Sequence, residues 1–102
     1  MSFHVKEDVD AVTVFLDGEI DLDRSPEARK LLLDGLRAGK PLRVDLAEVE
    51  YMDSSGIASL VETYQRAREK NLDFTLIRVS EPVLKVLKLA RLDQVFSIRS
   101  TP

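Results

Sequence analysis

The chain has 102 residues, of which 44% are hydrophobic and 32% charged, with a formal net charge of −3 and no cysteine. This length suits one domain, residues 1–102, with a single hydrophobic core. The lack of cysteine excludes disulfides, thiolate nucleophiles and cysteine-bound zinc. No apolar run approaches the roughly 20 residues that a membrane span needs.

The composition also narrows location and partners. The first five residues carry neither the basic nor the apolar region of a signal peptide, so we expect a cytoplasmic protein without membrane insertion. Basic residues are dispersed and are not interleaved with aromatic ones, so we expect no direct nucleic-acid binding. Nothing in the composition requires more than a monomer.

Two strands are predicted at the N-terminus. The first is marked by Val5, and the second by residues 12–16, in which Val12, Val14 and Leu16 alternate with Thr13 and Phe15. Asp8 and Asp10 supply turn chemistry around residues 9–11, so the two strands form a hairpin. Residues 17–23 then read as an acidic loop.

A first helix is predicted to follow that loop. Ser25 suits the N-cap and Pro26 the first helical position. Gly39 closes the helix, and Pro41 prevents its continuation. The apolar face consists of Ala28, Leu31, Leu32 and Leu36.

The middle of the chain predicts a short strand and a long helix. The strand covers Leu42 to Leu46, and residues 47–52 form a connector that ends in the turn Asp53-Ser54-Ser55-Gly56. The helix then runs to about Asn71. Its apolar positions follow helical spacing: Ile57, Leu60, Val61, Tyr64 and Ala67.

The remainder predicts a strand, a helix and a last strand. Residues 72–76 alternate as a strand does, and Ser80 caps a third helix. The inward positions of that helix are Val83, Val86, Leu87 and Ala90. Residues 95–98 form the last strand, and residues 100–102 a frayed tail. The order ββαβαβαβ predicts an α/β fold, a mixed sheet of about five strands covered by helices.

The turn at residues 53–56 is the main candidate site. It places two hydroxyls and a carboxylate at a helix N-terminus, where unpaired N–H groups and the helix dipole favour negative charge. A serine there accepts a phosphate without loss of the helix, and the added charge changes what the surface binds. Gly56, which has no Cβ, would let a partner approach the backbone beside Ser55. From physics alone, an ordinary N-cap is the favoured interpretation of the turn, because such caps are common at helix starts.

Other polar groups have simpler explanations. Asp17, Glu19, Asp21 and Asp23 are spaced like calcium ligands, but Ala28 stands where a calcium loop has its Glu, so we expect no metal. The stripe Lys85, Lys88, Arg91 is either a solvated face or a docking stripe for an acidic partner or anionic lipid.

No catalytic constellation is visible in the sequence. His4, the one histidine, has no Ser-His-Asp order around it, and no phosphate-binding loop occurs. We therefore expect a binding protein without a cofactor rather than an enzyme.

Four patches resemble the STAS domain family, and within it the bacterial anti-sigma factor antagonists. They are Gly18-Glu19-Ile20-Asp21, Val44-Asp45-Leu46, Met52-Asp53-Ser54-Ser55-Gly56, and Leu89-Ala90-Arg91-Leu92-Asp93 with Val95-Phe96. Each patch is weak alone, but their order and spacing are specific, and the match covers nearly the whole chain. The STAS fold that the resemblance implies agrees with the predicted elements.

The resemblance implies a partner switch. Its phosphoacceptor would be Ser55, and the partner-binding surface would include Asp21, Asp53, Ser54, Gly56 and Ile57. The unphosphorylated form would bind an anti-sigma factor that is itself a serine-protein kinase, and so release the sigma factor. Phosphorylation would end that binding, and a PP2C-type phosphatase would restore it.

A second function is implied by other members of the same family. Small STAS proteins resembling this chain are cytoplasmic subunits of ABC transporters that move phospholipid between membranes (MlaB-like). In that case the partners would be a permease and an ATPase, and no sigma factor would be involved. The serine turn also occurs at that interface, so Ser55 alone does not distinguish the two functions.

Overall fold

A computed structural model describes residues 3–99, in which one sheet has the strand order β1-β2-β3-β4-β5. The strands are β1 His4–Glu7, β2 Val12–Ile20, β3 Leu42–Met52, β4 Phe74–Ile77 and β5 Ser97–Arg99. β1 pairs antiparallel with β2, and every later neighbour pairs in parallel. The predicted mixed sheet is therefore confirmed, while the predicted tail at residues 100–102 lies outside the described residues.

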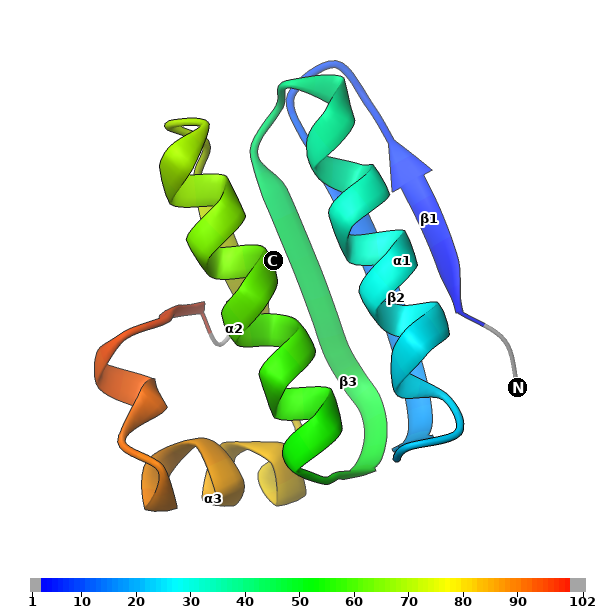
Figure 1. Ribbon diagram of the computed structural model, residues 1–102, viewed down its shortest axis with the longest axis vertical. Coiled ribbons are helices and arrows are strands. Elements are labelled where there is room, and N and C mark those ends of the chain that lie inside the picture. The colour runs from blue at the N-terminus through cyan, green and yellow to red at the C-terminus, as the bar shows by residue number, and fades with distance from the viewer. Residues whose placement is uncertain (1–2, 100–102) are drawn as a thin grey trace.

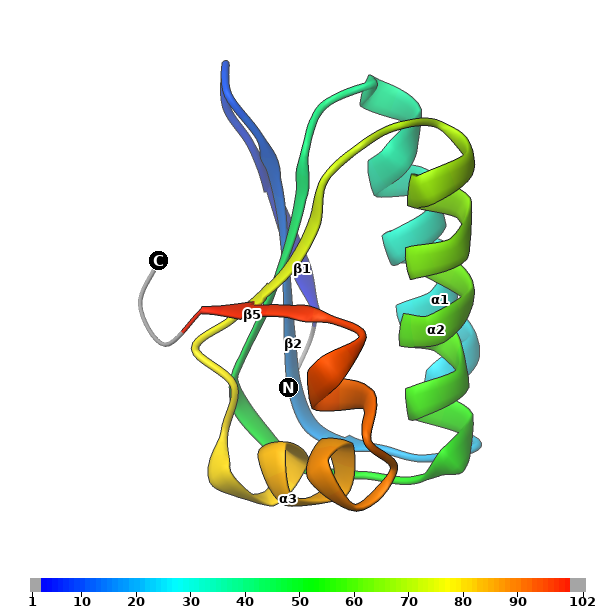
Figure 2. The same cartoon turned by 90° about the vertical axis from the view of Figure 1, so that its left-hand side faces the viewer.

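The helices are α1 Ser25–Gly35, α2 Ser54–Glu69 and α3 Glu81–Leu89, with 3₁₀ turns at Leu36–Ala38 and Leu92–Gln94. α1 and α2 lie side by side on one face of the sheet, and α3 lies at the end of the sheet where both of them begin (Figures 1 and 2). The predicted order of elements is confirmed. Parallel neighbours need a crossover connection, which α1 provides between β2 and β3 and α2 between β3 and β4. The starts of α1 and α2 therefore lie at the same end of the sheet.

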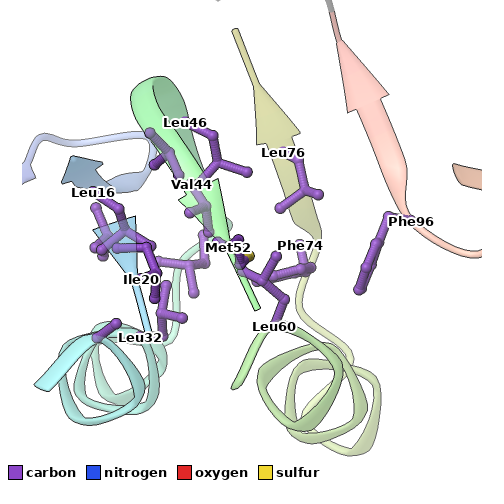
Figure 3. Close-up of a cluster of buried hydrophobic side chains, with 14 of the residues drawn as sticks. Leu16, Ile20, Leu32, Val44, Leu46, Met52, Leu60, Phe74, Leu76 and Phe96 are labelled. Atoms are coloured by element: carbon purple, nitrogen blue, oxygen red, sulfur yellow. The ribbon is translucent and has the colours of Figure 1, made fainter. Parts of the chain in front are cut away.

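The core fills the space between the sheet and these two helices. Val14, Val44 and Leu76 are paired in register on three neighbouring strands, and all are fully buried. Leu32 of α1 and Leu60 of α2 point into the same cluster (Figure 3). Each fully buried aliphatic side chain contributes about 1.5–3 kcal/mol, so this cluster fixes both helices against the strands.

Two strands are longer than predicted. β2 continues through Ile20, so most of the expected acidic loop is strand, and β3 continues to Met52, so the expected connector is strand as well. The two extensions pair with each other in parallel, but with register shifts between Phe15 and Asp17 and between Gly18 and Glu19. Gly18 also has a positive φ of 67°. Each shift leaves one extra residue on β3, so burial does not alternate regularly along β3, whereas it alternates along β2 through Ile20.

The predicted hairpin turn is confirmed, whereas the first helix differs at both ends. Asp8 Oδ1 accepts hydrogen bonds from the N–H groups of Asp10 and Ala11, at 2.8 and 2.9 Å. The N-cap of α1 is Arg24 rather than Ser25, and its side chain makes no capping bond. α1 ends at Gly35, and Gly39, with φ 71°, closes the 3₁₀ turn that follows.

Later boundaries also differ from prediction. α2 ends at Glu69 rather than near Asn71, and β5 covers 97–99 rather than 95–98 because a 3₁₀ turn precedes it. Ser80 does hold the N-cap position of α3, but its hydroxyl donates to the carbonyl of Val49 at 2.6 Å instead of capping. Ala90 is exposed rather than inward-facing.

Candidate functional site

The candidate site lies where β2 and β3 end together. Ile20 at the end of β2 pairs with Met52 at the end of β3, and the N–H of Asp53 donates to the carbonyl of Ile20 at 3.2 Å. α2 begins at the next residue, Ser54. The structure therefore brings Asp21 and the turn at residues 53–56 to one end of the sheet.

Asp53 is the N-cap residue of α2. Its Oδ1 accepts hydrogen bonds from the N–H of Ser55 at 2.9 Å, the N–H of Gly56 at 3.2 Å and the hydroxyl of Ser55 at 2.5 Å. The hydroxyl bond is the main reason that the pKa of Asp53 lies below its ordinary value, and the two amide bonds add to it. Asp53 therefore stays ionised. It also caps α2, as the N-cap interpretation of the sequence predicts.

The two serines of the turn face different depressions. Ser55 lines a depression of about 290 Å³ between α1 and α2, together with Ser25, Arg29 and Glu62. Ser54 is exposed and lines a wider groove of about 850 Å³ between α2 and α3. Successive helix residues point about 100° apart, which is why adjacent hydroxyls reach separate surfaces.

The wider groove, which we call the α2–α3 groove, has mainly apolar walls. Ile57 and Val61 line it from α2, Val86 from α3, and Tyr51, half exposed, from the end of β3. Ile57 and Val61 also pack against the core, so they are held in place. An apolar groove rimmed by polar groups is typical of a surface that binds a protein.

Gly56 is buried, and its missing Cβ serves packing inside the protein. A Cβ at this position would lie 2.5 Å from Cγ of Met52, 3.0 Å from Cγ2 of Ile20 and 3.1 Å from the carbonyl oxygen of Ile20. The start of α2 approaches the ends of β2 and β3 this closely only because residue 56 has no side chain. The sequence suggested that residue 56 is glycine to give a partner room; the structure shows instead that a Cβ would collide with Met52 and Ile20. Partner contact at Gly56 stays a prediction.

Asp21 is held in the turn between β2 and α1. Its Oδ1 accepts hydrogen bonds from the N–H groups of Asp23 and Arg24, at 3.0 and 3.2 Å. Arg24 also donates to the carbonyls of Asp17 and Glu19, at 2.7 and 3.2 Å, and pairs with Asp17 Oδ1 at 2.8 Å. Among residues 3–99 we find no cluster of three or more metal-ligating side chains placed to hold an ion.

Two structural residues at the site could not be found from the sequence. Arg24, besides its bonds to the end of β2, places its guanidinium 4.2 Å from the ring centroid of Phe3. Arg29 of α1 forms a two-pronged ion pair with Glu62 of α2, with both N–O distances 2.7 Å. Arg29 and Glu62 are 33 residues apart in the sequence, and no local pattern signals such a contact.

Only part of the predicted basic stripe lies on α3, because the helix ends at Leu89 and Arg91 follows it with a left-handed backbone, φ 60°. Lys85, Lys88 and Arg91 are exposed, as is Leu89 beside them. None is a lining residue of either depression described above. The solvated-face and docking-stripe interpretations both remain open for this stripe.

The fold and the site together define a small α/β domain that presents hydroxyls at a helix N-terminus beside an apolar groove. The family model described as "Mlab, STAS domain" matches residues 3–99. The chain belongs to the STAS domain family, as its motifs suggested. Within residues 3–99, no helix has the length and apolar character needed to cross a membrane.

Named relatives and solved structures agree with this family. The anti-sigma-B factor antagonist of Listeria monocytogenes is 29% identical over 102 residues, covering 98% of this chain and 90% of that protein. An anti-sigma factor antagonist from Mycobacterium paratuberculosis has a TM-score of 0.88 at 24% identity, covering 98% of this chain and 86% of the other. The anti-sigma factor antagonist SpoIIAA, solved in its unphosphorylated form, has a TM-score of 0.82 at 18% identity, covering 98% and 89%. At these identities the two structures show the shared fold.

Proposed function

We propose that this chain is an anti-sigma factor antagonist that works by reversible protein binding, with Ser55 as its phosphoacceptor. The unphosphorylated form binds an anti-sigma factor that is also a serine kinase, and the sigma factor is released. A PP2C-type phosphatase removes the phosphate and restores binding. The names of the curated relatives support the antagonist role.

The observation that carries this proposal is the environment of the Ser55 hydroxyl. It is partly exposed, at the start of α2, and donates to the ionised Asp53 at 2.5 Å. A kinase would transfer the γ-phosphoryl group of ATP to Oγ, forming an O–P bond as the bond to ADP breaks. The hydroxyl proton leaves in the same step, and Asp53 already accepts the hydrogen bond of that proton.

The added charge accounts for the loss of binding. A phosphoserine carries about −1.5 to −2 charges at neutral pH. It would add this charge at the start of α2, two residues from Asp53 and next to the groove residue Ser54. A partner whose surface fits the neutral hydroxyl would then face a dianion. A partner that removes water from this phosphate without pairing it loses several kcal/mol of affinity. Because each 1.4 kcal/mol is tenfold, that is enough for a switch.

A pull-down from lysate of the source cell tests the proposal. Wild type, Ser55→Ala and Ser55→Asp are used as baits, and captured proteins are identified by mass spectrometry. We expect wild type and Ser55→Ala, but not Ser55→Asp, to retain an anti-sigma factor with a kinase domain. Ser97→Asp is the matched control, because it adds the same charge at an exposed serine of β5, and it should retain the partner.

The transporter function is the second candidate, and the description of the matching family model favours it. An MlaB-like subunit would dock on a permease–ATPase assembly through the same end of α2. Recovery of a permease and an ATPase, whichever residue stands at position 55, would contradict the antagonist proposal and support the transporter role.

A further inference from the structure

A two-pronged ion pair joins the two helices beside Ser55. Arg29 Nε and Nη2 donate to the two carboxylate oxygens of Glu62, each at 2.7 Å. The hydrogen bond from Arg29 is the largest cause of a lowered pKa at Glu62, and the bond to Glu62 raises the pKa of Arg29. Ser55 lines the depression that holds this pair, so a charge added to Ser55 enters the same space.

Phosphorylation would remove the present partner of the Ser55 side chain. Oγ now donates its hydrogen to Asp53 Oδ1, and a phosphate ester has no such hydrogen to give. Asp53 is ionised and still accepts the amide N–H groups of Ser55 and Gly56, so it would repel the phosphate. The side chain of phosphoserine 55 must therefore turn away from Asp53.

The depression between α1 and α2 offers the phosphate both room and a cation. Its volume, about 290 Å³, is roughly ten times the 30 Å³ share of one water molecule. Arg29 is the cationic residue among the described side chains that line it. A guanidinium fork binds phosphate in the same two-pronged way as carboxylate, and phosphate carries more charge.

We propose that phosphate on Ser55 draws Arg29 away from Glu62, so that the ion pair across α1 and α2 becomes one between Arg29 and phosphoserine 55. This inference rests on the proposed function, because it describes what the phosphorylated state of that site does. The two helices stay joined in both states. What changes is the carboxylate of Glu62, which loses its guanidinium partner.

The released carboxylate of Glu62 changes the charge of the α2–α3 groove. Glu62 lines the depression between α1 and α2 and also the α2–α3 groove, whereas Ser55 is not among the residues that line that groove. A Glu62 without Arg29 presents its charge beside Ile57 and Val61, with Arg66 as the remaining nearby cation that favours its ionised form. An apolar partner segment would have to remove water from that charge.

The first test is a titration of the phosphate itself. Phosphoserine is incorporated at position 55 during translation, so that no kinase is needed, and its second ionisation is followed by ³¹P NMR. We expect its pKa to lie about 0.5–1 unit lower in wild type than in Arg29→Gln, since a cation in contact favours the doubly charged form. Arg37→Gln removes the same charge from an exposed residue in the 3₁₀ turn just after α1, and should match wild type.

The second test follows the carboxyl group of Glu62 by ¹³C NMR, with and without the phosphate. In the wild-type background, phosphorylation should raise the pKa of Glu62 toward its ordinary value, because Arg29 leaves. In the Arg29→Gln background the rise should be smaller, because only the field of the phosphate acts. An equal phosphate pKa in wild type and Arg29→Gln, or an equal rise of the Glu62 pKa in both backgrounds, overturns the inference. Because the phosphate is installed directly, either outcome is independent of whether a kinase acts on Ser55.

Discussion

Gly56→Ala tests whether close packing at the start of α2 positions the phosphoacceptor. In an ordinary helix the change stabilises by up to about 1 kcal/mol. Here the new Cβ would lie 2.5 Å from Cγ of Met52 and 3.1 Å from the carbonyl oxygen of Ile20. Met52 is fully buried and Ile20 O belongs to the backbone, so neither moves without disturbing the strand ends.

The expected change in the free energy of unfolding combines the cost of the clash with the helix preference of alanine. Overpacking of a buried position costs typically 1–3 kcal/mol, and the helix preference of alanine offsets part of it. We expect a net destabilisation of about 1–2 kcal/mol. With a urea m-value near 1 kcal/mol/M for a chain of this length, the unfolding midpoint should fall by roughly 1–2 M.

Gly35→Ala is the matched control for this measurement. Gly35 is also a buried helical glycine, but the closest atom to its added Cβ is Cδ1 of Leu42 at 2.9 Å, the far end of a flexible side chain. Its urea midpoint should change by clearly less than that of Gly56→Ala. A Gly56→Ala variant as stable as wild type, or more stable, would refute the packing explanation for Gly56.

Two further predictions concern the same end of the sheet. Arg24→Ala loses three hydrogen bonds to Asp17 and Glu19 and the contact with the ring of Phe3, so urea unfolding should show a loss of about 1–2 kcal/mol; no loss would mean that these bonds are replaced by water. Asp53→Asn should be less stable than wild type at pH 7 but lose less stability in acid, as measured by urea unfolding across a pH series. The pKa of Asp53 is lowered from 3.8 in the folded chain, so its stabilising contribution is complete above that value and is lost as the pH falls below it. Equal acid sensitivity of the two proteins would contradict this.

The order of elements and the placement of the site were predictable because they depend on local signals. The helices follow 3.6-residue periodicity, and most strands alternate every second residue. The resemblance of the turn at residues 53–56 to the STAS pattern added the family, which the matching family model confirms. Asp53 and Ser55 lie where that pattern predicts, at the start of a helix.

The extents of β2 and β3 were not predictable, because the register shifts there are a property of the pair. β3 has one extra residue opposite Phe15–Asp17 and another opposite Gly18–Glu19, so its buried positions stop alternating, whereas those of β2 alternate through Ile20. Taken alone, residues 47–52 show no regular alternation, and Asp17, Gly18 and Glu19 have the composition of a turn, so each segment is predicted to be a loop or connector. The partner strand supplies the hydrogen bonds that make it a strand.

The role of Gly56 shows the same limit at a single residue. Its position in the first turn of a helix was predicted, but the atoms that exclude a Cβ come from Ile20 and Met52, at the ends of two strands. Sequence spacing does not fix how closely a helix start approaches a sheet. An exposed glycine and a tightly packed one therefore look identical until the fold is known.

The geometry of α2 distinguishes the two candidate functions more sharply than the serine turn does. A transporter subunit needs the α2–α3 groove as a constant docking surface, so its binding should depend on Ile57 and Val61 and be indifferent to the charge at Ser55. A partner switch needs that groove to respond to Ser55, which faces the adjoining depression between α1 and α2. Ala58 and Glu62 line both surfaces, and of these two Glu62 carries a charge and is paired with Arg29. In a switch, Glu62→Gln should therefore weaken the effect of phosphoserine 55 on partner binding while leaving the binding of the unphosphorylated form intact. For a docking subunit, phosphoserine 55 should leave partner binding unchanged with either residue at position 62.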